Sequence, residues 1–125
     1  MKAAMGDATA YADRIERLAD EATVARATLD PDPPDDERAM ALLREGLGPT
    51  VALYCEARTG ESIARFTTAE FDRLQGAVDD WLAAYAACYG VTVDPDYSVR
   101  VAAELLVETH DIRDVAQLLT DVPER

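Results

Sequence analysis

The chain has 125 residues, of which 25 are acidic and 12 basic, so its formal net charge is −13 at neutral pH. This length fits one domain, which buries roughly two-thirds of its unfolded surface. The hydrophobic fraction of 49% is large enough for a packed core and excludes a wholly disordered chain. No stretch approaches the ~20 apolar residues of a membrane span, and the first residues lack the apolar run of a secretion signal.

The acidic residues are accompanied by eleven arginines and a single lysine, Lys2. This balance is typical of cytosolic proteins of salt-loving archaea, which work in molar potassium chloride. At about 1 M salt the Debye length is roughly 3 Å, so repulsion among surface carboxylates is largely screened. We therefore interpret the acidity as an adaptation to concentrated salt, rather than as the sign of an acidic active site or a basic partner. We expect a cytoplasmic protein that does not contact a membrane.

Alanine occurs 23 times, whereas only eight residues are aromatic. Because alanine favours helices and is a poor strand former, the sequence predicts an all-α fold, an irregular bundle of five or six helices. We expect a single domain over residues 1–125, with residues 1–7 flexible and residues 30–36 forming a connection rich in proline and aspartate.

The first helix is expected from Ala8 to Leu29. Its apolar residues alternate in spacing between four and three positions and so form one stripe: Tyr11, Ile15, Leu18, Ala22, Ala25 and Leu29. The stripe fits either the core of the same domain, which we favour, or the seam of a dimer. Ile15 and Leu18 are therefore candidate residues for self-association.

The connection is followed by an acidic N-cap and a helix over residues 38–44, which is expected to stop at Gly46–Gly48. Pro49 suits the first turn of another helix, over residues 50–58. Apolar residues also alternate in this segment, so a short β-hairpin around residues 51–66 is the alternative. The abundance of Ala, Leu, Glu and Arg favours the helix.

The strongest helix signal begins at Thr67, which can form a capping box with Glu70, and ends at Gly90. Gly76 inside this helix predicts a close crossing by another helix. Three aromatic residues share one face of the helix: Trp81, Tyr85 and Tyr89. Aromatic residues at helical spacing more often belong to a core than to a binding surface, so an interaction role for them is the secondary interpretation.

Two short helices are expected at the end of the chain, over residues 98–109 and 111–119, and Asp111 is expected to cap the second. Their apolar residues match a helix-turn-helix pattern, although Leu106 stands where the turn glycine is expected. The reading helix would present Arg113 and Gln117 to a nucleic acid. One arginine between two aspartates neutralises few phosphates, so two packed core helices are favoured and a transcription regulator with a helix-turn-helix in residues 98–120 is the alternative.

Glu104, Glu108 and Asp111 fall on one helical stripe. Magnesium prefers several oxygen ligands, and all-helical nucleotide pyrophosphatases arrange carboxylates in comparable rows. A magnesium-dependent nucleotide hydrolase using the Glu104/Glu108 stripe is thus a second alternative. Such a site needs a facing acidic cluster, for which Asp79 and Asp80 are the candidates, and a solvated acidic face is the favoured interpretation.

No combination of residues points to catalysis. His110 is the single histidine, and no serine or cysteine stands in the glycine context of a nucleophile elbow. Cys55 and Cys88 are isolated and form no ligand pattern, so we expect two buried thiols. We therefore expect no catalytic residue, no cofactor and no bound metal.

Three segments resemble small haloarchaeal proteins of unknown function. They are residues 41–46 (ALLREG), 79–85 (DDWLAAY) and 103–114 (AELLVETHDIRD). The likeness extends from about Tyr11 to Pro123, implies a cytosolic haloarchaeal setting and provides no catalytic residue.

These observations favour a non-enzymatic helical interaction module. The two strongly striped helices predict a homo-oligomer, most simply a dimer, or a complex with another protein, whereas a nucleic-acid partner is disfavoured. The candidate interaction residues are Trp81, Tyr85, Tyr89, Ile15 and Leu18.

Overall fold

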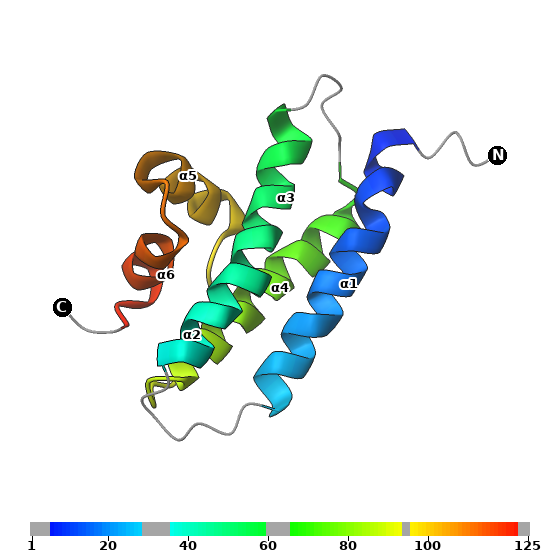
Figure 1. The fold of residues 1–125 in the computed structure, drawn as a ribbon. Helices are drawn as coiled ribbons and strands as arrows, with labels where there is room; N and C mark the ends of the chain where they lie inside the picture. Colours follow the sequence, from blue (N-terminus) through cyan, green and yellow to red (C-terminus); the bar gives the residue numbers. More distant parts are fainter. Residues whose placement is uncertain (1–5, 29–35, 60–65, 94–95, 123–125) are drawn as a thin grey trace.

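The computed structural model describes residues 6–28, 36–59, 66–93 and 96–122. These residues form helices and contain no strand, so the predicted all-α fold is confirmed. In chain order the elements are α1 (Gly6–Thr28), α2 (Asp36–Leu42), the π-helical turn η2 (Leu43–Leu47), α3 (Gly48–Thr59), α4 (Thr68–Ala87), α5 (Val99–Thr109) and α6 (Ile112–Thr120). Since α2, η2 and α3 follow one another without a break, the described residues make five helical rods (Figure 1).

The two segments expected to be irregular are only partly described. Residues 6 and 7, expected to be flexible, belong to α1, and residue 36, expected in the connection, is the first residue of α2. The rest of both segments lies outside the described residues. Within the described part of the chain, no helix combines the length and the apolar character needed to cross a bilayer.

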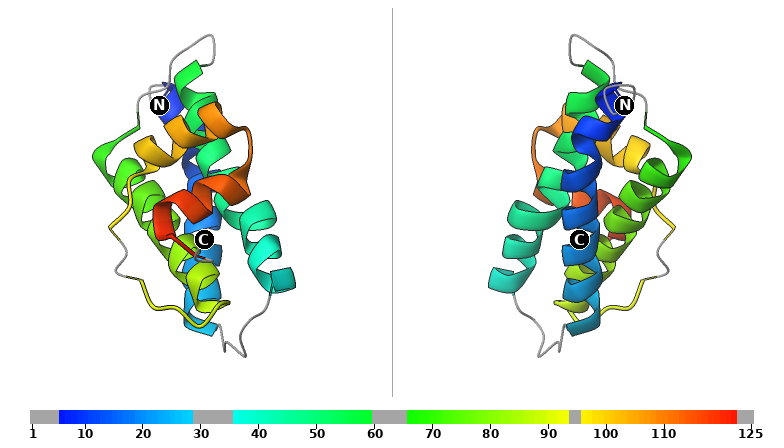
Figure 2. Two further views of the ribbon diagram at one scale, coloured as in Figure 1. Left: turned by 90° about the vertical axis from the view of Figure 1, so that its left-hand side faces the viewer. Right: turned by 90° about the vertical axis from the view of Figure 1, so that its right-hand side faces the viewer.

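Helix α4 is the centre of the bundle and contacts every other element. The predicted capping box fixes its start, because the Glu70 N–H donates to Thr67 Oγ1 at 3.0 Å and the Thr67 N–H donates to Glu70 Oε1 at 2.9 Å. Gly90 follows its end with a φ of 75°, a conformation that favours glycine. The α5–α6 pair and α1 lie on opposite sides of the bundle (Figure 2).

Helix α1 packs along α4, and its apolar stripe faces this contact. The buried residues of the stripe are Ile15, Leu18, Ala22 and Ala25. Ion pairs join the two helices at the surface, from Arg73 to Glu16 (2.9 Å) and Asp20 (3.2 Å), and from Arg26 to Asp80 (2.7 Å). The favoured interpretation, a stripe that faces the core of its own domain, is confirmed.

The predicted stop at Gly46–Gly48 is wrong, because the chain stays helical from α2 through η2 into α3. Pro49 accounts for the wide turn, since proline has no N–H to donate and its ring collides with the carbonyl four residues earlier in a regular α-helix. In η2 the Gly48 N–H instead donates to the Leu43 carbonyl, five residues earlier. The fully buried Thr50 donates its hydroxyl to the Gly46 carbonyl at 2.8 Å, so this acceptor is satisfied.

The helix expected over residues 50–58 is confirmed as α3, and the alternative hairpin around residues 51–66 is wrong. The buried apolar residues of α3 recur at helical spacing rather than every second position: Val51, Leu53, Tyr54 and Ala57. Residues 60–65 lie outside the described part of the chain.

The expected close crossing at Gly76 is also wrong, because a Cβ placed on Gly76 meets no atom within 4 Å. The close approach occurs at Gly46, against the ring of Trp81. A glycine in a helical pattern marks a place where a close contact is tolerated, and only the packing shows whether one is made.

Asp111 caps α6 with its side chain as predicted, and the side chain of Ser98 caps α5. His110, with a φ of 57°, ends α5, so the turn consists of residues 110 and 111. Leu106, expected in the turn, lies inside α5. The register of the proposed helix-turn-helix pattern is therefore wrong.

Candidate functional site

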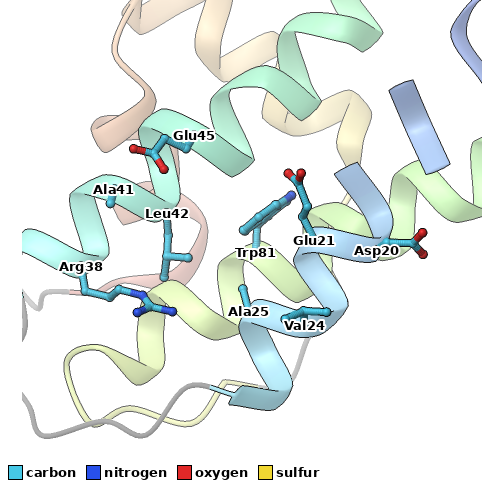
Figure 3. Close-up of a pocket in the computed structure, with 9 residues that line it drawn as sticks. All are labelled: Asp20, Glu21, Val24, Ala25, Arg38, Ala41, Leu42, Glu45 and Trp81. Carbon is cyan, nitrogen blue, oxygen red and sulfur yellow. The ribbon is translucent and has the colours of Figure 1, made fainter. Parts of the chain in front are cut away.

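A hollow of about 530 Å³ opens between α1 and the α2–η2 segment, with α4 beneath it (Figure 3). It is lined by Asp20, Glu21, Val24 and Ala25 of α1, by Arg38, Ala41, Leu42 and Glu45 of the α2–η2 segment, and by Trp81 of α4. We call this hollow the Trp81 pocket. Its volume falls within the roughly 300–1,000 Å³ that is usual for ligand sites, which also combine an apolar lining with a few polar groups.

The indole of Trp81 forms the inner wall of the pocket and is only 5% exposed. Its six-membered ring lies against the backbone of η2 at Gly46. A Cβ on Gly46 would approach the Cε3, Cδ2 and Cζ3 atoms of the ring to 2.5–2.6 Å, far inside normal contact. The π-helical turn and its glycine therefore create the space in which the indole lies.

The indole N–H of Trp81 has no hydrogen-bond partner among the residues that the structure describes. Within the described part of the chain, Nε1 is the one buried side-chain polar atom that lacks a hydrogen-bond partner. Most buried polar groups are paired, and an unpaired donor costs about 1–3 kcal/mol. Figure 3 shows the nitrogen end of the ring beside Glu21. The pocket thus contains a hydrogen-bond donor, and none of the described residues supplies an acceptor for it.

Charged side chains surround the mouth of the pocket, three carboxylates against one guanidinium. Asp20 pairs with Arg73 at 3.2 Å, and Glu45 lies 3.7 Å from Arg44. The side chain of Glu21 is exposed and makes neither a hydrogen bond nor an ion pair with any described residue. Glu21 is therefore the acidic group at the mouth that is available to a cation.

The predicted aromatic row is divided between two places. Tyr85 and Tyr89 contact each other edge to face, with ring centroids 5.5 Å apart, and do not line the Trp81 pocket. The buried Tyr85 donates its hydroxyl to the Val122 carbonyl at 2.7 Å, and burial raises the pKa of its phenol. Burial, together with a hydrogen bond to Asp36, raises the pKa of Tyr89 well above its ordinary value near 10. These two tyrosines hold α4 to its neighbours.

The structure places the other interaction candidates, Ile15 and Leu18, in the core between α1 and α4. Their side chains are therefore enclosed within one chain and present no surface to a second one. Self-association, which stays a prediction, would need another part of the surface.

Arg113 and Gln117, the candidate nucleic-acid contacts, lie on α6 beside a small hollow of about 120 Å³. The hollow is lined also by Met40, Tyr85, Tyr89 and Asp114. Arg113 is exposed and Gln117 is half-buried, and both face α2 and α4 rather than a protruding surface. The carboxylates of Asp111 and Asp114 lie on the same short helix, so its surface is not a basic one.

Glu104 and Glu108 line a different hollow, of about 400 Å³, between α5 and α3. The residues that α3 contributes to it are Tyr54 and Cys55, which are not acidic. No group of three or more histidine, cysteine, aspartate or glutamate side chains suited to a metal ion occurs among the described residues.

The facing acidic cluster considered for a metal, Asp79 and Asp80, has structural partners instead. Asp79 accepts the Tyr97 N–H at 2.9 Å and so holds the chain that leads into α5, while Asp80 pairs with Arg26. Burial raises the pKa of the Asp79 carboxyl, which is partly opposed by this hydrogen bond.

The cysteines and the histidine are separated in the fold. Cys88 is buried, as predicted, whereas Cys55 is only half-buried, and burial raises the pKa of the Cys55 thiol. A raised pKa lowers the thiolate fraction and hence the reactivity. His110 is exposed at the end of α5.

Sequence reasoning found only one wall of the pocket, Trp81. The lining residues that it missed come from α1 and from the α2–η2 segment, and include Glu21, Val24 and Leu42. The available signal was the Gly46–Pro49 segment inside a helical pattern, because proline and glycine there indicate an irregular turn beside which a side chain can lie.

Comparisons with known proteins agree with the absence of a familiar motif. No curated protein and no solved structure is significantly similar to the chain. One family model matches residues 9–124, which is almost the whole length. The chain therefore belongs to the family described as a domain of unknown function, DUF8055.

Proposed function

We propose that this protein is a non-enzymatic helical interaction module that holds a segment of a partner protein in the Trp81 pocket. The observation that carries the proposal is the buried indole N–H of Trp81, a residue that lines an open hollow; this N–H has no acceptor among the described residues. An indole N–H is only a hydrogen-bond donor, so it can orient a ligand but does not exchange protons in a reaction. The pocket is thus suited to recognition rather than to bond breaking.

The setting that we propose is the concentrated-salt cytosol of a halophilic archaeon. The net charge of −13 and the single lysine support it. In such a solution, apolar contacts and short-range hydrogen bonds contribute most to binding, because charges further apart than a few ångströms are screened. A pocket with an apolar wall and one buried donor meets this requirement.

The proposal is tested by partner capture with two matched variants. Val24 is 58% exposed at the pocket, and Val107 is 66% exposed on α5, outside it. We expect the tagged wild-type chain and Val107→Lys to retain the same protein from an extract of the host cells in about 2 M potassium chloride, and Val24→Lys to lose it. If no protein distinguishes the two variants, the pocket is not the interaction site.

Self-association is part of the same proposal and has its own measurement. Sedimentation in about 2 M potassium chloride should give a particle near twice the monomer mass of 13.6 kDa. If the chain is strictly monomeric, self-association is ruled out and the partner must be a protein of a different sequence.

A further inference from the structure

We propose that the occupant of the Trp81 pocket is an extended, basic peptide segment of the partner, with a main-chain carbonyl that accepts from Trp81 and a lysine or arginine that pairs with Glu21. This inference rests on the proposed function, because it names the chemistry of the partner at the same site. It is carried by three properties of the pocket as the described residues form it: an indole N–H without an acceptor, a Glu21 carboxylate without a cation, and an apolar lining.

The donor selects an occupant with an available carbonyl. Trp81 Nε1 can only donate, so the occupant must bring an acceptor to the inner wall. The main-chain carbonyls of a helix interior already accept hydrogen bonds, whereas those of an extended segment are available. An extended segment also sends alternate side chains to opposite sides, so one side chain can enter the apolar lining near Leu42 while the next reaches the mouth.

Glu21 lies both beside the Trp81 N–H, where the carbonyl of the occupant would bind, and among the charged groups at the mouth of the pocket. The Trp81 nitrogen is shielded from solvent, so an acceptor reaches it only after a neighbouring side chain moves. Glu21 is exposed and lies beside the nitrogen end of the ring in Figure 3. A cation that draws the Glu21 carboxylate outward would uncover the N–H, and the two contacts would then form together.

The other charges at the mouth make Glu21 the contact for the cation. Asp20 is already paired with Arg73, and Glu45 has Arg44 close by. A basic side chain at Glu21 forms a new pair without breaking an existing one. In molar salt this attraction acts only at direct contact. It therefore favours a basic residue at the position of the partner that reaches Glu21, whatever the overall charge of the partner.

The test uses three synthetic peptides of equal length that contain no tryptophan. The first alternates lysine and leucine around a central proline, which prevents a helix; the second has glutamate in place of lysine; the third has alanine in place of proline and is stapled as a helix. Trp81 is the single tryptophan of the chain, so its emission reports binding at the pocket. We expect a saturable shift with the first peptide and at least about tenfold weaker binding of the other two.

Two variants examine the contacts separately. Glu21→Gln should weaken the first peptide about fivefold, whereas Glu104→Gln, a matched change of an exposed glutamate on α5, should leave its affinity unchanged. Trp81→Phe, shown by circular dichroism to be folded, should weaken it about fivefold in calorimetry.

The outcomes separate this inference from the proposed function. Equal binding of the glutamate peptide, or equal behaviour of Glu21→Gln and Glu104→Gln, overturns the basic segment, and equal binding of the stapled helix overturns the extended one. In either case the partner capture that depends on Val24 can still succeed. Its failure would instead remove the interaction function and this inference together.

Discussion

The backbone of Gly46 and the six-membered ring of Trp81 are in such close contact that a single methyl group on Gly46 would approach three ring atoms to 2.5–2.6 Å. This contact joins the π-helical turn to the central helix and fixes the inner wall of the pocket. The stability of the fold and the shape of the candidate site therefore depend on the same two residues.

Replacing Gly46 by alanine should displace the indole. We expect Gly46→Ala to lower the free energy of unfolding by about 1–3 kcal/mol, as is usual for overpacking, and to shift the emission of Trp81. Chemical denaturation followed by fluorescence measures both. Gly76→Ala is the matched control, because its Cβ meets no atom, and it should raise the free energy of unfolding by about 1 kcal/mol. Equal effects of the two variants would contradict the contact.

Removing the Tyr85 hydroxyl should loosen the end of the chain from α4. Tyr85→Phe leaves the Val122 carbonyl without its donor, so we expect the free energy of unfolding to fall by about 1–2 kcal/mol. Tyr11→Phe, at a half-buried tyrosine, should change it by less than about 0.5 kcal/mol. Urea unfolding of both variants provides the comparison, and a neutral Tyr85→Phe would mean that the hydrogen bond contributes nothing.

The half-buried Asp79 should make stability depend on pH. Burial raises the pKa of this carboxyl above its ordinary value near 3.8, so the folded state favours the protonated form. Its contribution to stability is therefore fully present below about pH 3.8 and is lost as the pH rises through the raised pKa.

Asp79→Asn keeps an oxygen that can accept the Tyr97 N–H but has no charge to bury. The free energy of unfolding of the wild type, relative to that of Asp79→Asn, should decrease between acidic and neutral pH, as measured by urea titrations across this interval. Asp72→Asn, at an exposed position on the same helix, controls for the loss of one negative charge. A difference between wild type and Asp79→Asn that is the same at every pH would contradict the raised pKa.

The surplus of negative charge should make the stability of the fold depend on the salt concentration. We expect the free energy of unfolding to rise between about 0.1 M and 2 M potassium chloride, because screening weakens the repulsion among carboxylates. Sucrose, which stabilises folded proteins without screening charge, separates this effect from a general preference for the compact state. Equal stability in dilute buffer and in concentrated salt would contradict an adaptation to brine.

The elements that the sequence predicted well are those that local chemistry decides. Thr67 and Glu70 form their capping box within four residues, and Asp111 caps α6 through a backbone N–H two residues later. The stripe of α1 was also readable, because its spacing persists over several turns and demands one buried face. The spacing does not show which surface covers that face, because packing on α4 of the same chain and packing on a second chain demand the same stripe.

The elements predicted less well depend on contacts between distant residues. A glycine and a proline normally end a helix, but before Pro49 the chain widens into a π-helical turn, in which the Gly48 N–H donates to the Leu43 carbonyl, and the helix continues. The pocket was inaccessible to sequence reasoning for a similar reason. Glu21 and Leu42 belong to different helices, and only their common packing on α4 brings them to the sides of Trp81.

The wide turn at Leu43–Leu47 also sets the rotation of α2 relative to α3. Each residue turns an α-helix by about 100°, so a chain shortened by one residue within the turn would rotate one of these two helices by that angle. Either Leu42 would leave the Trp81 pocket or Val51 would leave the core. The number of residues in this segment is therefore as constrained as their identity, in a region that an inspection of the sequence would take for an ordinary connection.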